Sequence, residues 1–160
     1  MVIWSDDIGD LSDQSRTAPN CRFVIDDLEQ DWVYPASRHF NYIHQRSMSG
    51  SIGDWTRLYK QALTHLQPGG WLEIQEFEVW FYSQMPEGLP KDSAITKWQN
   101  LIDEGSLRMG RRLNYARCFK SHLEEAGFGD IRTQAFKVRP AITNSITAFP
   151  DSSLRSCRLR

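Results

Sequence analysis

LQPGGWLEIQEF (residues 66–77) combines the end of a helix, a tight turn and the start of a strand. Pro68 cannot continue a helix, and Gly69 and Gly70 can adopt the positive φ that lets the chain reverse direction. The mostly apolar run over residues 71–77 has the composition of a buried strand. Helix, turn and strand make half of a βαβ unit, so the sequence predicts an open α/β sheet. Ligands of such sheets bind at the carboxyl ends of the strands.

Three helices are predicted around this strand. The clearest spans residues 52–66, where apolar side chains recur at helical spacing and either Ser51 or Asp54 is the N-cap. A second is predicted for residues 93–107, and a third for residues 114–126, which a glycine would end. The apolar residues of the second helix are expected to point into the core: Ile95, Trp98, Leu101 and Ile102.

Short apolar runs predict four further strands, at residues 1–3, 21–25, 40–44 and 131–138. Two carboxylates, Asp26 and Asp27, follow the second of these strands, and His44 ends the third. The end of the chain is rich in Ser and Thr and shows no clear period. We therefore expect one domain over residues 1–139 and an irregular tail over residues 140–160.

Charge and cysteine content narrow the classes of function. The 160 residues include 19 basic and 20 acidic side chains, a net charge of -1, which does not favour binding to nucleic acid or to an anionic membrane. Three widely spaced cysteines indicate a reducing compartment rather than a disulfide framework. The N-terminus lacks a secretory signal, and no apolar stretch reaches the roughly 20 residues of a membrane span. We expect a cytoplasmic protein, with the nucleus as the alternative.

One pair of side chains is compatible with a metal ion. Cys118 and His122 lie one helical turn apart on the third predicted helix. No further ligand lies near them in the sequence, so we expect Cys118 to be packed and His122 to be exposed. No metal site is predicted.

Four stretches of the chain are distinctive when taken together: PNCRFVIDDLEQDWVYP, FNYIHQRSMSGSIGDW, LQPGGWLEIQEF and LEEAGFGDI. They resemble the S-adenosylmethionine-dependent methyltransferases of fungi, and within them the LaeA-like group associated with secondary metabolism. The Pro-Gly-Gly turn is shared by many methyltransferases, whereas YIH followed by R-x-x-S-G-S-I-x-D-W is much narrower. The resemblance implies a Rossmann-like class I methyltransferase sheet, mostly parallel, with an antiparallel last hairpin.

In that scheme the predicted strands correspond to the second to fifth strands of the family and to part of its closing hairpin. The glycine-rich turn after the family's first strand is absent from this sequence. The resemblance therefore implies an incomplete sheet that lacks the central first strand, and a truncated methyltransferase. Asn41 also replaces the acidic residue that is usual in the family's fourth strand.

The resemblance also implies a set of site residues for S-adenosylmethionine. Asp6 or Asp10 would accept hydrogen bonds from the ribose hydroxyls, and Asp26 or Asp27 from the adenine amino group. His44 and Arg46 would lie beneath the methionine part and the transferred methyl group.

Two residues are candidates for proton transfer. His44 could act as a general base, as histidines often do, and Glu76 stands at the carboxyl end of its predicted strand. A structural interpretation competes in each case. The aspartates can be solvated residues of turns, and His44 can be a half-buried histidine bonded to a backbone carbonyl.

Three hypotheses follow for function. The first is methyl transfer from S-adenosylmethionine to a small metabolite. The second is a non-catalytic, methyltransferase-like partner or regulator, which could associate with a complete methyltransferase or with itself through an open sheet edge. The third is a fragment of a longer reading frame with no function of its own.

Overall fold

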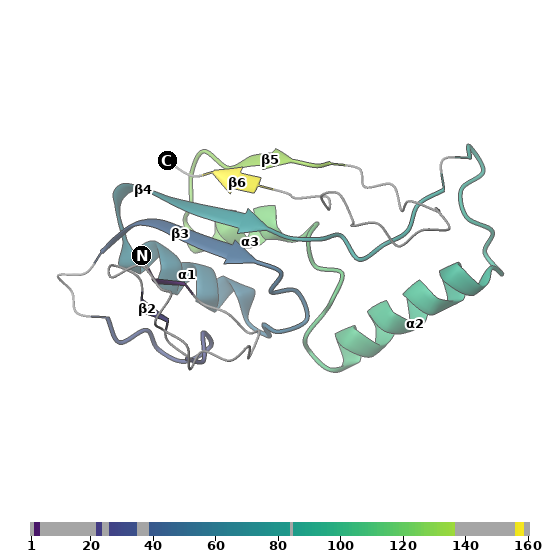
Figure 1. The fold of residues 1–160 in the computed structure, drawn as a ribbon, viewed down its shortest axis with the longest axis horizontal. Helices are drawn as coiled ribbons and strands as arrows, with labels where there is room; N and C mark the ends of the chain where they lie inside the picture. Colours follow the sequence, from purple (N-terminus) through teal and green to yellow (C-terminus); the bar gives the residue numbers. More distant parts are fainter. Residues whose placement is uncertain are drawn as a thin grey trace.

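The computed structural model describes residues 2–3, 22–23, 26–34, 39–83, 85–136 and 156–158, and its elements are labelled in Figure 1. The strands are short, apart from two that run side by side through the centre of the molecule. In chain order the elements are β1 (Val2–Ile3), β2 (Arg22–Phe23), β3 (Phe40–Arg46), α1 (Trp55–His65), β4 (Leu66–Gln75), α2 (Ala94–Arg108), α3 (Phe119–Ala126), β5 (Arg132–Gln134) and β6 (Ser156–Arg158).

The central unit is β3–α1–β4, and β3 and β4 pair in parallel as predicted. Ile43 lies opposite Leu72 in the register. The turn at the start of β4 depends on its glycines: Gly69 has a φ of +78°. A Cβ added at Gly70 would lie 2.9 Å from a backbone oxygen, that of Gln67, so only glycine fits there. Of the two glycines, only Gly69 takes the positive φ that the sequence suggested for both.

Two further pairs of strands flank this unit. β1 and β2 pair in parallel, in agreement with their predicted places as neighbouring strands. β5 pairs antiparallel with β6, which also lies against β4, so residues 132–134 of the predicted strand at 131–138 take part in an antiparallel pair, as the resemblance implied. β6 falls within the tail that we expected to be irregular, and the other residues of that tail lie outside the described ones. Among the described strands, β3 is hydrogen-bonded to β4 alone.

The core lies between the β3–β4 sheet and two helices, α1 and α3. Its most buried side chains alternate along β4 and recur at helical spacing along α1 and α3, as the sequence predicted for α1. The ring of Trp55 stacks on that of Tyr115 at 5.1 Å and meets that of Phe119 edge-on at 5.0 Å. The largest fully buried side chains are Trp55, Tyr59, Leu72, Ile74, Leu123 and Glu76.

The helix ends correct the predicted boundaries. The Asp54 side chain accepts a hydrogen bond from the backbone N–H of Arg57 at 2.9 Å, so Asp54, and not Ser51, is the N-cap of α1. α3 begins at Phe119 rather than at residue 114, because residues 116–118 form a turn. Gly127 ends α3 with a φ of +103°, as predicted.

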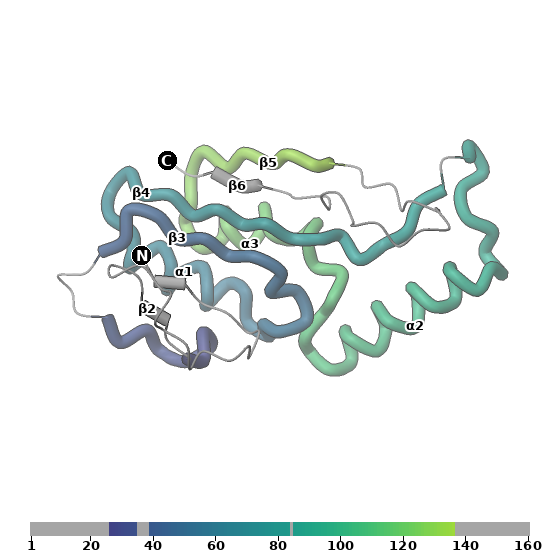
Figure 2. Tube along the Cα trace, viewed as in Figure 1, coloured from purple at the N-terminus to yellow at the C-terminus, as the bar shows by residue number. Residues whose placement is uncertain are grey.

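The helix α2 follows its predicted bounds but not its predicted environment. Ser93 caps it by accepting from the backbone N–H of Thr96 at 3.2 Å. Figure 2 shows α2 standing apart from the sheet and from the other helices. The residues predicted to point into the core are exposed, and the prediction was wrong for all four: Ile95 by 49%, Trp98 by 48%, Leu101 by 68% and Ile102 by 36%.

Within the described residues, no helix is long and apolar enough to cross a membrane.

Candidate functional site

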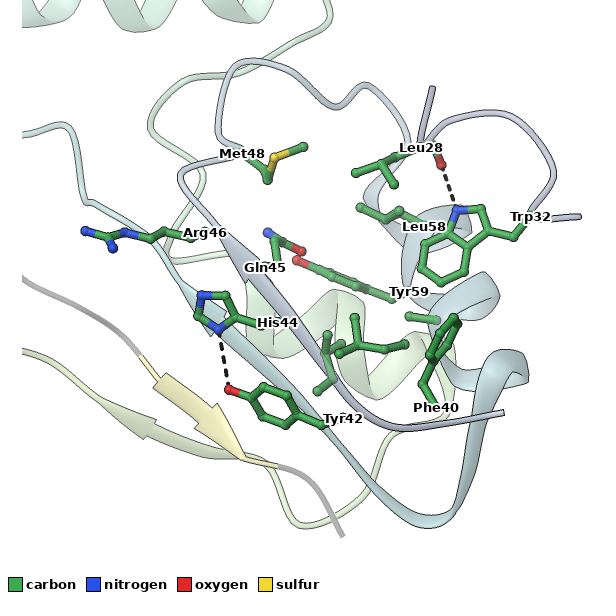
Figure 3. Close-up of a pocket in the computed structure, with 13 residues that line it drawn as sticks. Leu28, Trp32, Phe40, Tyr42, His44, Gln45, Arg46, Met48, Leu58 and Tyr59 are labelled. Atoms are coloured by element: carbon green, nitrogen blue, oxygen red, sulfur yellow. Dashed lines mark hydrogen bonds between the residues drawn. The ribbon is translucent and has the colours of Figure 1, made fainter. Parts of the chain in front are cut away.

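A pocket of about 370 Å³ runs along β3 (Figure 3). Consecutive residues of β3, from Tyr42 to Arg46, all line it. Because neighbouring side chains of a strand point to opposite faces of the sheet, a cavity lined by all of them must follow the edge of the strand. This is the edge of β3 that faces away from β4. The remaining lining residues are Leu28, Trp32, Phe40, Met48, Leu58, Tyr59, Ala62 and Leu72.

The wall of the pocket opposite β3 comes from α1 and from the segment of residues 26–34. The backbone N–H of Trp32 donates to Gln61 Oε1 on α1 at 2.9 Å, and its indole Nε1 donates to the carbonyl of Leu28 at 3.3 Å. These bonds fix the indole and Leu28 over the apolar side of α1. The floor of the pocket is therefore apolar.

Polar groups gather at the carboxyl end of β3, where His44, Gln45 and Arg46 follow one another. Gln45 Nε2 is buried and has no hydrogen-bond partner. A buried donor without an acceptor costs about 1–3 kcal/mol. That cost favours a ligand or solvent oxygen at this end of the pocket.

His44 has a carboxylate partner that the sequence did not indicate. His44 Nδ1 lies 2.9 Å from Glu73 Oε2 on β4, and the Tyr42 hydroxyl donates to the same carboxylate oxygen. His44 and Glu73 are direct neighbours in the parallel register, so only knowledge of that register could have paired them. A carboxylate at Nδ1 holds the proton there and leaves Nε2 as the basic atom of the ring.

Glu76 is 2% exposed and belongs to the frame of the site. One carboxylate oxygen accepts from the backbone N–H groups of Met48 and Ser49 at 2.7 and 2.8 Å, and the other from that of Phe77 at 3.0 Å. The side chain thus ties the loop after β3 to the end of β4. Glu76 does not line the pocket, but it positions Met48, which does. Its catalytic role stays a prediction.

The paired aspartates after β2 are exposed and lie beside the pocket rather than in it. Asp27 accepts from the backbone N–H of Glu29 at 2.9 Å and from the Gln30 side chain at 3.3 Å. The hydrogen bond from Glu29, followed by that from Gln30, lowers the pKa of Asp27. Asp26 accepts from the backbone N–H of Asp27 at 2.9 Å. Both carboxylates therefore shape the turn that carries Leu28 to the pocket.

The two alternatives for the ribose-binding carboxylate, Asp6 and Asp10, lie outside the described residues. Their role stays a prediction, as does that of Arg46, which the structure places in the pocket lining.

Glu29 is a structural residue that sequence reasoning missed. Its Oε1 accepts from the backbone N–H groups of Gly53 and Asp54 at 2.8 and 3.2 Å, and its Oε2 pairs with Arg111 at 2.6 Å. Burial raises the pKa of Glu29, but the hydrogen bonds from Gly53 and Arg111 outweigh it and leave that pKa lowered. Glu29 thus anchors the pocket wall to the start of α1. In sequence it reads as one acid in a surface loop, so no pattern could have revealed it.

His122 is not exposed as predicted but half-buried between α1 and α3. Its Nδ1 lies 2.9 Å from the Thr56 hydroxyl, and its Nε2 contacts the Tyr115 hydroxyl. Burial raises the pKa of Tyr115 to about 12. Among the described residues no cluster of His, Cys, Asp and Glu could hold a metal ion.

The comparisons with known proteins agree with this architecture. A family model described as a methyltransferase domain matches residues 7–132. The chain is 43% identical over 128 residues to "Methyltransferase pytC" of Aspergillus terreus, a match that covers 78% of this chain and 38% of that protein.

Two more distant relatives carry different names. "Methyltransferase cpsF" of Aspergillus campestris is 29% identical over 119 residues, covering 71% of this chain and 40% of that protein. "Secondary metabolism regulator LAE1" of Cochliobolus heterostrophus is 32% identical over 129 residues, covering 77% of this chain and 40% of that protein. The chain thus spans about two fifths of the length of the relatives it matches.

The parallel β3–α1–β4 unit, with a pocket along β3, is that of an α/β domain. The match over residues 7–132 gives that domain its family: the chain belongs to the methyltransferase-domain proteins, and its relatives are fungal methyltransferases and regulators of secondary metabolism. The resemblance seen in the sequence is confirmed.

Proposed function

We propose that this chain is part of a methyltransferase that binds S-adenosylmethionine in the pocket along β3 and methylates a small metabolite of fungal secondary metabolism. The single observation that supports this best is the His44–Glu73 pair at the carboxyl end of β3, in a chain of the methyltransferase family. The carboxyl ends of parallel strands are where α/β sheets bind their ligands. The cysteine usage fits the cytoplasm or the nucleus for such an enzyme.

The described residues fit S-adenosylmethionine in part. A volume of about 370 Å³ lies at the small end of the range for ligand sites. Arg46 would pair with the carboxylate of the methionine part, Gln45 Nε2 would supply its unused hydrogen bond, and the apolar floor would take the less polar groups. The carboxylates proposed for the ribose, Asp6 or Asp10, and for the adenine, Asp26 or Asp27, complete the set. The sheet in this proposal is an incomplete Rossmann-like one formed by residues 1–139.

The chemistry at this site divides between the cofactor and the protein. S-adenosylmethionine supplies an electrophilic methyl group on a sulfonium. His44 would take the proton of the attacking hydroxyl or amine at Nε2, while Glu73 holds Nδ1 and stabilises the imidazolium that results. Leu28 and Trp32 would exclude water from the apolar part of the pocket.

A second candidate is a non-catalytic partner or regulator of the same family. The local bonds of Asp27 favour it, because a carboxylate already engaged by two donors of its own turn is a poor acceptor for an adenine amino group. The edge of β3 away from β4 also has no hydrogen-bonded strand among the described residues, and such edges pair with other chains. In this proposal the partner is a complete methyltransferase.

Titration calorimetry of the chain with S-adenosylmethionine separates the two candidates. The enzyme hypothesis predicts a Kd on the order of micromolar. Arg46→Ala should weaken binding about 10-fold or more, because it removes a charge-assisted hydrogen bond. Asp26→Ala with Asp27→Ala should abolish binding if those carboxylates hold the adenine.

His44→Asn and Lys91→Ala are the matched comparisons. His44→Asn should leave cofactor binding within about 3-fold of the parent, because it removes the base and not the binding groups. Lys91, exposed and remote from the pocket lining, should have no effect when changed to Ala. A folded sample that shows no heat of binding would rule out the enzyme in this chain and leave the partner role.

A further inference from the structure

Tyr42 is a third member of the cluster that His44 forms with Glu73. It precedes His44 by two residues on β3, so the two side chains leave the same face of the sheet. Their rings are stacked, with centroids 6.2 Å apart and an interplanar angle of 20°. The Tyr42 hydroxyl donates to Glu73 Oε2, and His44 Nδ1 lies 2.9 Å from that same oxygen. Two side chains of β3 therefore meet on one carboxylate oxygen of β4.

The position of the hydroxyl proton decides what Nδ1 can do. The Tyr42 hydroxyl lies 3.4 Å from His44 Nδ1, close enough to reach that nitrogen as well as Glu73. A hydroxyl has a single proton to donate, and a carboxylate accepts more strongly than a neutral imidazole nitrogen. Because the hydroxyl proton goes to Glu73, Nδ1 is left to carry a proton of its own toward Oε2.

The contribution of this cluster to folding is small. Tyr42 is 53% exposed, and polar pairs at exposed sites add little to stability. The Glu73 side chain is 19% exposed, and it is long and flexible, so a second bond to its carboxylate chiefly restricts its rotamers. Tyr42 therefore acts on the orientation of Glu73 more than on the stability of the sheet.

We propose that Tyr42 is a positioning residue that acts through Glu73. By holding Oε2 against His44 Nδ1, it keeps the neutral imidazole protonated at Nδ1 and leaves Nε2 free to take a proton. A neutral imidazole without such a partner is protonated mainly at Nε2, where it then has no lone pair to offer. The use of this arrangement in methyl transfer rests on the proposed function, in which His44 is the base, but the tautomer is a property of the chain without any cofactor.

Nitrogen-15 NMR of the histidine rings measures the tautomer on the whole chain. At about pH 8.5 histidines are neutral, and correlations between ring nitrogens and carbon-bound protons distinguish Nδ1–H from Nε2–H. The chain has four histidines, and the signals lost in His44→Asn identify those of His44. We expect His44 to be protonated mainly at Nδ1.

Tyr42→Phe keeps the ring and removes the hydroxyl. It should lower the ratio of Nδ1–H to Nε2–H at His44 by roughly 5-fold, an effect of the size of one hydrogen bond. Tyr82→Phe is the matched control, because Tyr82 is 58% exposed and its hydroxyl donates to a different carboxylate, that of Glu78, at 2.6 Å. It should leave the ratio at His44 unchanged.

Glu73→Ala shows whether Tyr42 acts through Glu73. Without the carboxylate, the Tyr42 hydroxyl can donate to Nδ1, so His44 should be protonated mainly at Nε2. In that background Tyr42→Phe should no longer lower the ratio. An equal loss in both backgrounds would show that Tyr42 acts on His44 without Glu73 and would overturn the proposal.

Two further results would overturn it: a parent chain in which His44 is protonated mainly at Nε2, and a Tyr42→Phe variant with the ratio of the parent. Neither result depends on cofactor binding, so a chain that gives no heat with S-adenosylmethionine can still carry the Nδ1–H tautomer. Where the cofactor binds, Tyr42→Phe should leave its Kd within about 3-fold of the parent, because Tyr42 acts on the base and not on the cofactor.

Discussion

The helices α1, α2 and α3 are all amphipathic, but their apolar residues differ in burial. Those of α1 and α3 are buried in the core, whereas those of α2 are largely exposed. Along α1, Trp55 and Tyr59 are 2% and 1% exposed and form the core with α3. On α2, Trp98 also belongs to the apolar residues that were predicted to face the core, but it is 48% exposed. Hydrophobic periodicity predicts that a helix has an apolar face, but it does not say what covers that face.

The surroundings of each helix explain the difference. α1 leads directly into β4 through the Pro-Gly-Gly turn, so its apolar face must lie on the sheet that β4 forms with β3. α2 is preceded by a long loop and followed by another, and side-chain hydrogen bonds anchor it instead of a buried apolar face. The prediction of a buried apolar face was therefore right for α1 and wrong for α2.

The largest difference in the free energy of unfolding should be that between the alanine variants of Trp55 on α1 and Trp98 on α2. Trp55→Ala should lower the free energy of unfolding by about 3–5 kcal/mol, because it leaves a cavity among closely packed rings. Trp98→Ala should change it by less than about 1 kcal/mol, because the Trp98 ring is half-exposed and packs on the Phe81 ring outside the core. Urea unfolding followed by circular dichroism measures both.

A milder core variant keeps this comparison informative if Trp55→Ala does not fold. Ile74→Val, at a residue that is 0% exposed, should cost about 1 kcal/mol. Similar losses for Trp55→Ala and Trp98→Ala would show that α2 packs against the body of its own chain.

The next effect concerns two glutamates near the ends of β3 and β4. Glu76→Gln should destabilise the fold by about 2 kcal/mol, because an amide cannot accept from all three backbone N–H groups. Glu73→Gln should cost less than about 1 kcal/mol, because its partner His44 is 37% exposed at the side chain. Unfolding in urea compares the two, and amide exchange at Met48 and Ser49 should accelerate only in Glu76→Gln.

An acid-sensitive contact anchors α2 and not α1. The hydrogen bond from Arg112 lowers the pKa of Asp103. A carboxyl whose pKa is lowered by folding adds stability above its unfolded pKa of about 4 and loses it as the pH falls through the folded value. Asp103→Asn should therefore cost about 1 kcal/mol at neutral pH and progressively less below about pH 4.

Glu104→Gln is the control for this titration. Glu104 pairs with Arg108 at 2.6 Å, but both side chains are more than half exposed, so the loss should be small at any pH. An equal and pH-independent loss for the two variants would contradict the role of Asp103.

The sequence predicted the central unit well because its signals are local. A cap at Asp54, the stripe along α1 and the Pro-Gly-Gly turn lie within neighbouring residues, and they place β3 and β4 in parallel. The site was predicted only in part. His44 was predicted to end its strand, but β3 runs on to Arg46. Its partner Glu73 depends on the register between strands, and Glu29 depends on contacts with backbone amides more than 20 residues away. Hydrophobic periodicity along the sequence does not predict contacts between residues so far apart.

The smallest expected effect comes from removing the N-cap hydrogen bond of α1 and that of α2 in turn. The two variants compare the stability of the two helices directly. Asp54→Ala removes the bond to the Arg57 N–H and should lower the global free energy of unfolding by about 1 kcal/mol, because α1 belongs to the cooperative core. Ser93→Ala removes the equivalent bond to the Thr96 N–H at the start of α2. Its cost should appear as faster amide exchange confined to α2, because a helix whose apolar residues stay outside the core can open without it.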